Sequence, residues 1–127
     1  MTAAFLLKRG EIMRALFVAA ALLWSVVTAF AADPVGSYDV QGQNPDGSKY
    51  SGTVTVTQTG QTFRVVWRIG NTRYNGTGIG DKNFLAVSYT SGNESGLALY
   101  GADGDNWKGI WTYAGGTKMG AEMWGRD

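Results

Sequence analysis

Histidine and cysteine are both absent from this chain of 127 residues, and proline occurs only twice. Without these two residue types the protein cannot carry a disulfide framework, a cysteine nucleophile, a serine–histidine pair or a zinc site of the usual kind. Charge is also scarce and balanced, with 11 Lys and Arg against 10 Asp and Glu and no run of one sign. We therefore expect no nucleic-acid surface held by counterion release.

Paired carboxylates are the acid–base groups that remain, and their densest cluster is Asp103-Gly104-Asp105. This cluster lies between two predicted strands, where Asp and Gly are typical of a turn. A calcium loop is the alternative, but its further ligands, including a distal Glu, are missing. We expect no catalytic residue, no metal site and no cofactor, and hence a protein that is not an enzyme.

Residues 1–31 are typical of an export signal. Three basic residues precede an uninterrupted small and apolar stretch at 15–27, and Ala29 and Ala31 supply the small side chains that a signal peptidase recognises. Cleavage after Ala31 would leave one β domain, residues 32–127, in the periplasm or secreted, without a stable membrane anchor. An uncleaved anchor is the alternative, because the uncharged run reaches the lower limit for a spanning helix. Met13 could serve as the start as well as Met1, since a complete signal follows it.

Beyond Val35 the apolar residues alternate with a period of two, punctuated by Gly, Asn and Asp, and no helical periodicity is present. The clearest alternation places Tyr50, Val54 and Val56 on one face of a strand. Eight strands are predicted, at Gly36–Gly42, Tyr50–Gln58, Phe63–Ile69, Arg73–Ile79, Phe84–Tyr89, Leu97–Tyr100, Trp107–Tyr113 and Met119–Trp124. Because every connection is short enough for a hairpin, we expect an all-β fold: a small up-and-down antiparallel barrel or, as second choice, a strongly curved open sheet.

Aromatic residues are followed two positions later by glycine at Tyr50, Tyr74 and Trp107. Residues two apart share a face of a strand, so each glycine leaves space beside a large ring. A neighbouring ring can then lie over bare backbone, and the strand can bend. These pairs predict tight curvature around an aromatic interior.

Glu122 lies in the last predicted strand, where Met119 and Met123 occupy one face and Glu122 and Trp124 the other. Lone acids are seldom fully buried, which favours the methionines inside and a solvated Glu122, paired across strands with Lys108 or an arginine. If Glu122 instead points inward with Trp124, it needs a partner. The interior would then hold a pocket with one acid and several aromatics.

Two further groups of residues are candidates for binding. Arg64, Arg68 and Arg73 share the outer surface of one hairpin and could bind a carboxylate, a phosphate or a polyanionic partner, although outward charges also keep a β-surface soluble. Trp107 and Trp111 share one face of a strand. They are either core or, together with Trp67, Glu122 and Trp124, the lining of a pocket for a small apolar or sugar ligand.

The chain from Val35 to Trp124 resembles a group of small exported bacterial proteins commonly labelled fibronectin-binding. The resemblance lies in Val35-Gly36-Ser37-Tyr38-Asp39-Val40-x-Gly42, Asn44-Pro45-Asp46-Gly47-Ser48-x-Tyr50-x-Gly52, Val66-Trp67-Arg68-Ile69-Gly70, Tyr74-x-Gly76-Thr77-Gly78 and Gly120-x-Glu122. It implies attachment to a host matrix protein and carries over no ligand-binding residue. A second likeness, through Gly36-x-Tyr38 and the count of eight strands, is to lipocalin and avidin barrels.

Two functions follow as expectations. The first is an exported, non-enzymatic protein that binds a protein or matrix partner such as fibronectin through its β-surface, at the three arginines. The alternative is a carrier of a small apolar or sugar ligand with a lipocalin-like interior pocket.

Overall fold

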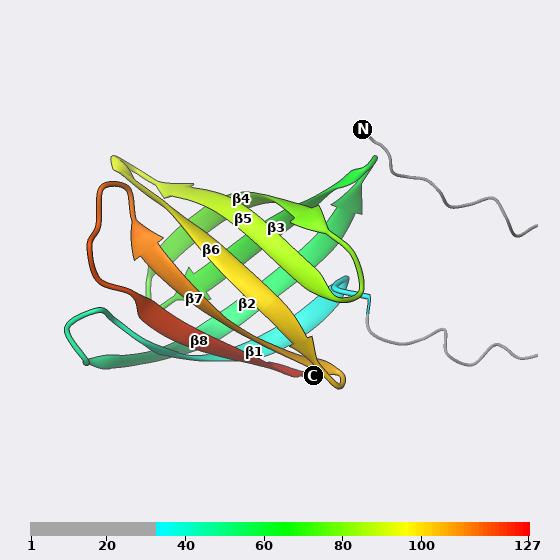
Figure 1. Cartoon of the computed structure of the whole chain (residues 1–127), viewed down its shortest axis with the longest axis horizontal. Coiled ribbons are helices and arrows are strands. Elements are labelled where there is room, and N and C mark those ends of the chain that lie inside the picture. Colours follow the sequence, from blue (N-terminus) through cyan, green and yellow to red (C-terminus); the bar gives the residue numbers. More distant parts are fainter. Residues whose placement is uncertain (1–32) are drawn as a thin grey trace, which may run out of the picture. The chain divides into compact units, whose positions relative to one another are not determined.

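The computed structural model describes residues 33–127, so the predicted signal peptide and both candidate start methionines lie outside the described residues. Eight antiparallel strands follow one another around a closed barrel (Figure 1). They are β1 (Gly36–Gln43), β2 (Lys49–Thr59), β3 (Thr62–Ile69), β4 (Thr72–Gly80), β5 (Phe84–Ser91), β6 (Glu94–Asp103), β7 (Asn106–Tyr113) and β8 (Gly120–Arg126). Residues 33–127 contain no helix that is long and apolar enough to cross a membrane.

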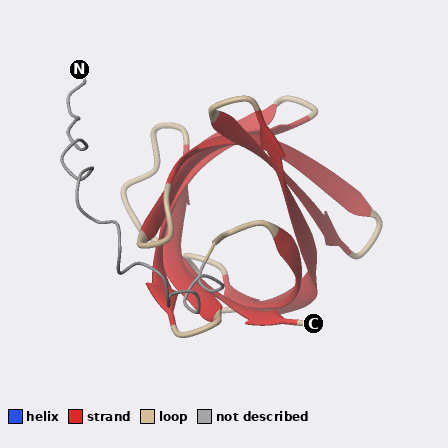
Figure 2. Ribbon diagram, turned by 90° about the vertical axis from the view of Figure 1, so that its right-hand side faces the viewer, coloured by secondary structure: helices blue, strands red, loops and turns tan. Residues whose placement is uncertain are grey.

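Pairing between the first and last strands closes the barrel. Val40 of β1 lies opposite Gly52 of β2 on one side and opposite Trp124 of β8 on the other. Viewed along its axis, the sheet forms a complete ring (Figure 2). Closure removes every unpaired sheet edge. The predicted barrel is therefore confirmed, and the open curved sheet is wrong.

The alternation of side chains sends the predicted faces of β2 and β3 inward: Val54, Val56, Val65 and Trp67 are all buried. The prediction that the methionine face of β8 points into the barrel is wrong. Met119 and Met123 are 63% and 59% exposed, whereas Glu122 is only 6% exposed and Trp124 1%. Lys108, the proposed partner of Glu122, lies opposite Met123 on the outer surface.

Interior glycines lie beneath large rings, and the ring usually belongs to the neighbouring strand. Gly42 pairs with Tyr50 and Gly109 with Tyr100. A Cβ atom at either glycine would overlap the ring of its partner. The aromatic–glycine pattern thus lets rings lie flat over the backbone of a strongly curved sheet.

One half of the barrel interior is filled. This half lies at the end of the barrel where the N-terminal end of β1 pairs with the C-terminal end of β8. Its core residues are Tyr38, Val40, Val54, Val56, Phe63, Val65, Leu85, Val87, Trp107 and Trp124. We refer to these residues as the packed half. Trp124 stacks at a tilt on Tyr38 and Tyr100, with ring centroids 5.3 and 4.3 Å apart.

Residues near both ends of the described chain close the end of the barrel that is next to the packed half. The Tyr38 hydroxyl donates to the Pro34 carbonyl at 2.7 Å. The Arg126 guanidinium donates to the carbonyls of Val35, Asp33 and Asp105 at 2.9 to 3.1 Å, and it lies 4.7 Å from the centre of the Tyr38 ring. Arg126 therefore fastens the segment before β1 and the β6–β7 turn to β8.

Candidate functional site

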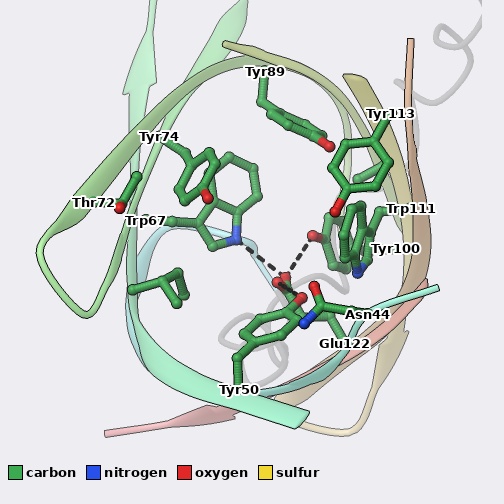
Figure 3. Close-up of a pocket in the computed structure, with 12 residues that line it drawn as sticks. Asn44, Tyr50, Trp67, Thr72, Tyr74, Tyr89, Tyr100, Trp111, Tyr113 and Glu122 are labelled. Atoms are coloured by element: carbon green, nitrogen blue, oxygen red, sulfur yellow. Dashed lines mark hydrogen bonds between the residues drawn. The ribbon is translucent and has the colours of Figure 1, made fainter. Parts of the chain in front are cut away.

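The other half of the interior holds a cavity of about 270 Å³. It lies at the end of the barrel formed by the β1–β2, β3–β4, β5–β6 and β7–β8 connections, the left end in Figure 1. The lining consists of Asn44, Tyr50, Trp67, Ile69, Thr72, Tyr74, Tyr89, Ala98, Tyr100, Trp111, Tyr113 and Glu122 (Figure 3). We call this region the open half.

Glu122 from β8 lies where the open half meets the packed half, and four donors converge on its carboxylate. Its Oε1 atom accepts the Trp67 indole N–H at 3.1 Å, the Tyr100 hydroxyl at 2.7 Å and the Trp124 indole N–H at 2.8 Å. Its Oε2 atom accepts only the Tyr50 hydroxyl, at 2.6 Å. Glu122 is thus a buried acid whose hydrogen-bond partners are all uncharged.

The tyrosines that hold Glu122 are kept in their protonated form. Burial raises the pKa of Tyr100 well above its usual value, and the negative charge of Glu122 and the hydrogen bond to it raise it further. The same causes, in the same order, raise the pKa of Tyr50. Because a phenol donates only when protonated, both hydroxyls remain donors to Glu122 at neutral pH.

Aromatic rings in edge-to-face contact form the wall of the cavity. The Tyr89 ring centroid is 5.9 Å from that of Trp67, 6.1 Å from that of Tyr74 and 6.4 Å from that of Trp111. Trp111 in turn contacts Tyr113 at 5.1 Å. Burial raises the pKa of Tyr89 to about 12, with smaller contributions from nearby tyrosines and acids. Such contacts fix the rings, so the wall is preorganised.

Glycines lie beneath two of the rings that line the cavity. Gly120 of β8 lies opposite Trp111, and Gly96 of β6 meets the Tyr89 ring. Ala98 is the smallest side chain among the described residues that line the cavity. The indole N–H of Trp111 is buried without a hydrogen-bond partner among the described residues.

The structure separates the pocket residues expected from the sequence. Trp67, Trp111 and Glu122 line the cavity, whereas Trp107 and Trp124 lie in the packed half. Trp124 still reaches the site through its hydrogen bond to Glu122. The sequence analysis did not assign a role in the pocket to Tyr50, Tyr74, Tyr89 and Tyr100. The inward parity of Tyr50, Tyr74 and Tyr89, near the same end of three strands, was the signal that could have found them. Tyr100 lies farther along β6, opposite Leu85 of the packed half.

Arg64, Arg68 and Arg73 lie on the outer surface of β3 and β4, away from the cavity. Arg68 is the direct cross-strand neighbour of Arg73, and Arg64 lies opposite Thr77. All three are exposed. The three arginines therefore form a cationic outer face, and their role in binding a partner stays a prediction.

Apolar side chains occupy the outer face of the sheet on β5 to β8, which the sequence analysis did not assign. Leu99 lies opposite Ile110, and Ile110 lies opposite Ala121. Leu99 and Ile110 are 51% and 44% exposed. Phe84 and Met123 flank a shallow depression beside them.

The Asp103–Asp105 segment forms the tight turn between β6 and β7, with Gly104 at a φ of 66°. Within residues 33–127, no three His, Cys, Asp or Glu side chains gather closely enough to hold a metal ion. The polar groups that line the cavity are phenols, indole N–H groups, the Asn44 amide, the Thr72 hydroxyl and the Glu122 carboxylate.

Comparison with known proteins supports the barrel and gives no family. No family model matches the chain, and no curated protein matches it in sequence. The resemblance to the fibronectin-binding group therefore gains no support beyond the residues that suggested it.

Among solved structures, designed barrels share the fold. A redesigned β barrel is 18% identical over 73% of this chain and 91% of its own, with a TM-score of 0.62. A second redesigned barrel, mFAP1 bound to DFHBI, is 18% identical over 71% of this chain and 93% of its own, with a TM-score of 0.59. A de novo designed fluorescence-activating barrel is 13% identical over 73% and 93%, at a TM-score of 0.56. The chain thus adopts an eight-stranded antiparallel barrel similar to these.

Proposed function

We propose that this protein binds a small organic molecule inside the open half of its barrel. The observation that carries the proposal is the cavity itself: about 270 Å³ of space walled by aromatic rings, in a barrel whose other half is filled with side chains. A protein interior is normally packed to the density of an organic crystal. An aromatic pocket with a few convergent polar groups is the usual form of a ligand site.

The size of the cavity limits the ligand. Sites for drug-sized molecules run from about 300 to 1,000 Å³, so a space of about 270 Å³ suits one or two rings rather than a lipid chain. Two of the structural neighbours, mFAP1 and mFAP2b, are described as bound to DFHBI, which supports a barrel of this kind as a ligand holder. We place this function ahead of the matrix-binding function, which has no comparable support.

Tryptophan fluorescence tests the proposal directly, because Trp67 and Trp111 line the cavity. The purified protein, expressed from the full sequence, would be titrated with 2-phenylethanol, 2-phenylethylamine and glucose. Ala98→Phe places a ring in the cavity, and Leu99→Phe places the same ring on the outer surface as a matched control. We expect saturable changes in the wild type and in Leu99→Phe, and none in Ala98→Phe. Binding that survives in Ala98→Phe, or no binding by any probe, would contradict the proposal.

A further inference from the structure

Among residues 33–127, the carboxylate of Glu122 has no cationic hydrogen-bond partner. It is 6% exposed, and its four hydrogen-bond partners are two phenols and two indoles. None of the described residues that line the cavity is a Lys or an Arg. Buried acids in proteins are almost always paired with a cation, because desolvation of the charge is costly. A cationic ligand in the cavity would supply the positive charge that the lining residues do not provide.

The two oxygens of Glu122 are not equally occupied. Each carboxylate oxygen offers about two lone-pair sites. Oε1 already accepts three donors, whereas Oε2 accepts only the Tyr50 hydroxyl. Oε2 thus retains acceptor capacity, and Glu122 belongs to the cavity lining (Figure 3). One more N–H donor could bind there.

The aromatic rings around the cavity also favour a positively charged ligand. Tyr74, Tyr89, Trp111 and Tyr113 surround the cavity. The faces of such rings carry negative potential and attract ammonium groups, most strongly where water is excluded. An anion would meet both these faces and the Glu122 carboxylate. A cation gains from both.

A neutral polyhydroxylated ligand fits less well. The hydroxyls of Tyr50 and Tyr100 already donate to Glu122, so they are not free to donate to a sugar oxygen. An apolar ligand would leave the free acceptor site of Oε2 unused. A donor that carries positive charge gains electrostatically from both the carboxylate and the ring faces, which a neutral donor does not.

We propose that the ligand of the open half is an organic cation: a protonated amine that donates to Glu122 Oε2 while its apolar part lies among the aromatic rings. This inference rests on the proposed ligand-binding function and specifies the chemical class of ligand that it serves. It replaces the apolar or sugar ligand expected from the sequence with a charged one.

A matched set of three probes tests the inference in the wild-type protein. The compounds 2-phenylethylamine, 2-phenylethanol and phenylacetate share a phenyl ring on a short chain and are cationic, neutral and anionic at neutral pH. Dissociation constants would be measured by tryptophan fluorescence and checked by calorimetry. We expect the amine to bind at least about tenfold more tightly than the alcohol, and phenylacetate to bind most weakly. An alcohol that binds as tightly as the amine would overturn the inference while leaving the ligand-binding function standing. If none of the three binds, both proposals fall.

Variants then assign the effect to one carboxylate. Glu122→Gln removes the charge with little change of shape, and Asp39→Asn removes one charge from the exposed outer face of β1 as the matched control. We expect Glu122→Gln to reduce the preference for the amine over the alcohol to about twofold or less, and Asp39→Asn to keep it near tenfold. Retention of the full preference in Glu122→Gln, with its fold verified by circular dichroism, would contradict the assignment. If this variant does not fold, the order of the three probes in the wild type decides the inference alone.

Discussion

The two halves of the barrel interior use similar aromatic residues for different purposes. Trp107 and Trp111 lie on the inward face of the same strand, β7, and both have a buried indole N–H that finds no hydrogen-bond partner within residues 33–127. Trp107 is enclosed in the packed half, whereas Trp111 lines the cavity. An aromatic stripe therefore does not by itself distinguish a core from a binding site. What distinguishes the two halves is the set of residues between the rings.

In the packed half the spaces between the rings are filled by branched aliphatic side chains such as Val54, Val65 and Leu85, and Arg126 closes the end. In the open half the lining between the rings has fewer branched aliphatic side chains: Ile69, Thr72 and Ala98 are its small or aliphatic members, and the rings are mostly tyrosines. A tyrosine brings a polar group to the tip of each ring, which suits a surface that faces a ligand or water. The packed half therefore contributes most of the buried aliphatic contacts, whereas the open half leaves a cavity unfilled.

Alkaline pH should produce the largest effect, and mainly through the open half. The pKa is raised for Tyr38 in the packed half, and for Tyr50, Tyr74, Tyr89 and Tyr100 in the open half, with burial as the first cause in every case. The folded state therefore retains phenolic protons that the unfolded chain releases near pH 10. This stabilisation is complete below that pH and is lost as the pH rises through the folded pKa, which is about 12 for Tyr89.

We accordingly expect the protein to unfold cooperatively as the pH rises above about 10, with most tyrosines ionising only as it unfolds. Tyrosinate absorbance and circular dichroism, recorded on the same samples, would give coincident transitions. Ionisation of most tyrosines at their ordinary pKa while the β signal persists would show that these hydroxyls are not buried in the folded state.

Removal of the two indoles of β7 tests the comparison between the halves directly. Trp107→Ala should lower the free energy of unfolding by about 3 to 5 kcal/mol, because it leaves a void in a packed region. Trp111→Ala should cost roughly 1 to 2 kcal/mol, since one side of its ring faces the cavity and fewer contacts are lost. Urea denaturation of both variants provides the measurement. Equal losses would mean that the two halves are packed alike.

Arg126 should matter for stability although it is a surface cation. Arg126→Ala removes three charge-assisted hydrogen bonds to backbone carbonyls and the contact with Tyr38. We expect a loss of about 1 to 3 kcal/mol in the free energy of unfolding, without a change in ligand affinity. Thermal and urea unfolding would measure it, with Arg68→Ala on the outer face as the control. A variant as stable as the wild type would show that Arg126 is not needed to close the barrel end next to the packed half.

The outer arginines should have the smallest effect. Replacement of Arg64, Arg68 and Arg73 together by Ala should change the free energy of unfolding by no more than about 0.5 kcal/mol per site and leave small-ligand affinity unchanged. A pull-down on immobilised fibronectin, run with the same variant, tests the alternative function. Binding by the wild type that the triple variant loses would favour the arginine face over the open half as the functional surface.

The sequence was sufficient for the barrel, because its information is local. Period-two alternation and short Gly- and Asn-containing turns indicate eight strands joined by seven consecutive hairpins, an arrangement that favours a barrel. The pairing of β1 with β8 then closes it. The interior face of β8 was predicted wrongly because the rule that lone acids stay outside takes no account of their partners. Trp67 and Tyr100, which satisfy Glu122, come from strands distant in sequence. No local pattern brings those three residues together.

The division of the interior into a packed and an open half could not be predicted from the sequence either. It depends on which inward positions of different strands lie at the same height in the barrel, and the stagger of the strands determines that. The Tyr89 and Trp111 rings are in contact although they belong to β5 and β7, which are separated by β6. The sequence placed Trp107 and Trp111 on one face of a strand, but it assigned no face to Tyr89 and did not show that a cavity lies beside these rings.

Equilibrium unfolding of a matched pair of variants tests the central claim most directly. Ala98→Phe adds a ring to the open half, and Val65→Phe adds one to the packed half at a position with 0% exposure. We predict that Ala98→Phe changes the free energy of unfolding by less than about 1 kcal/mol, because the cavity has room for the ring. Val65→Phe should lower it by about 1 to 3 kcal/mol through overpacking. Equal destabilisation by the two substitutions would contradict the account, because the open half would then hold no usable space.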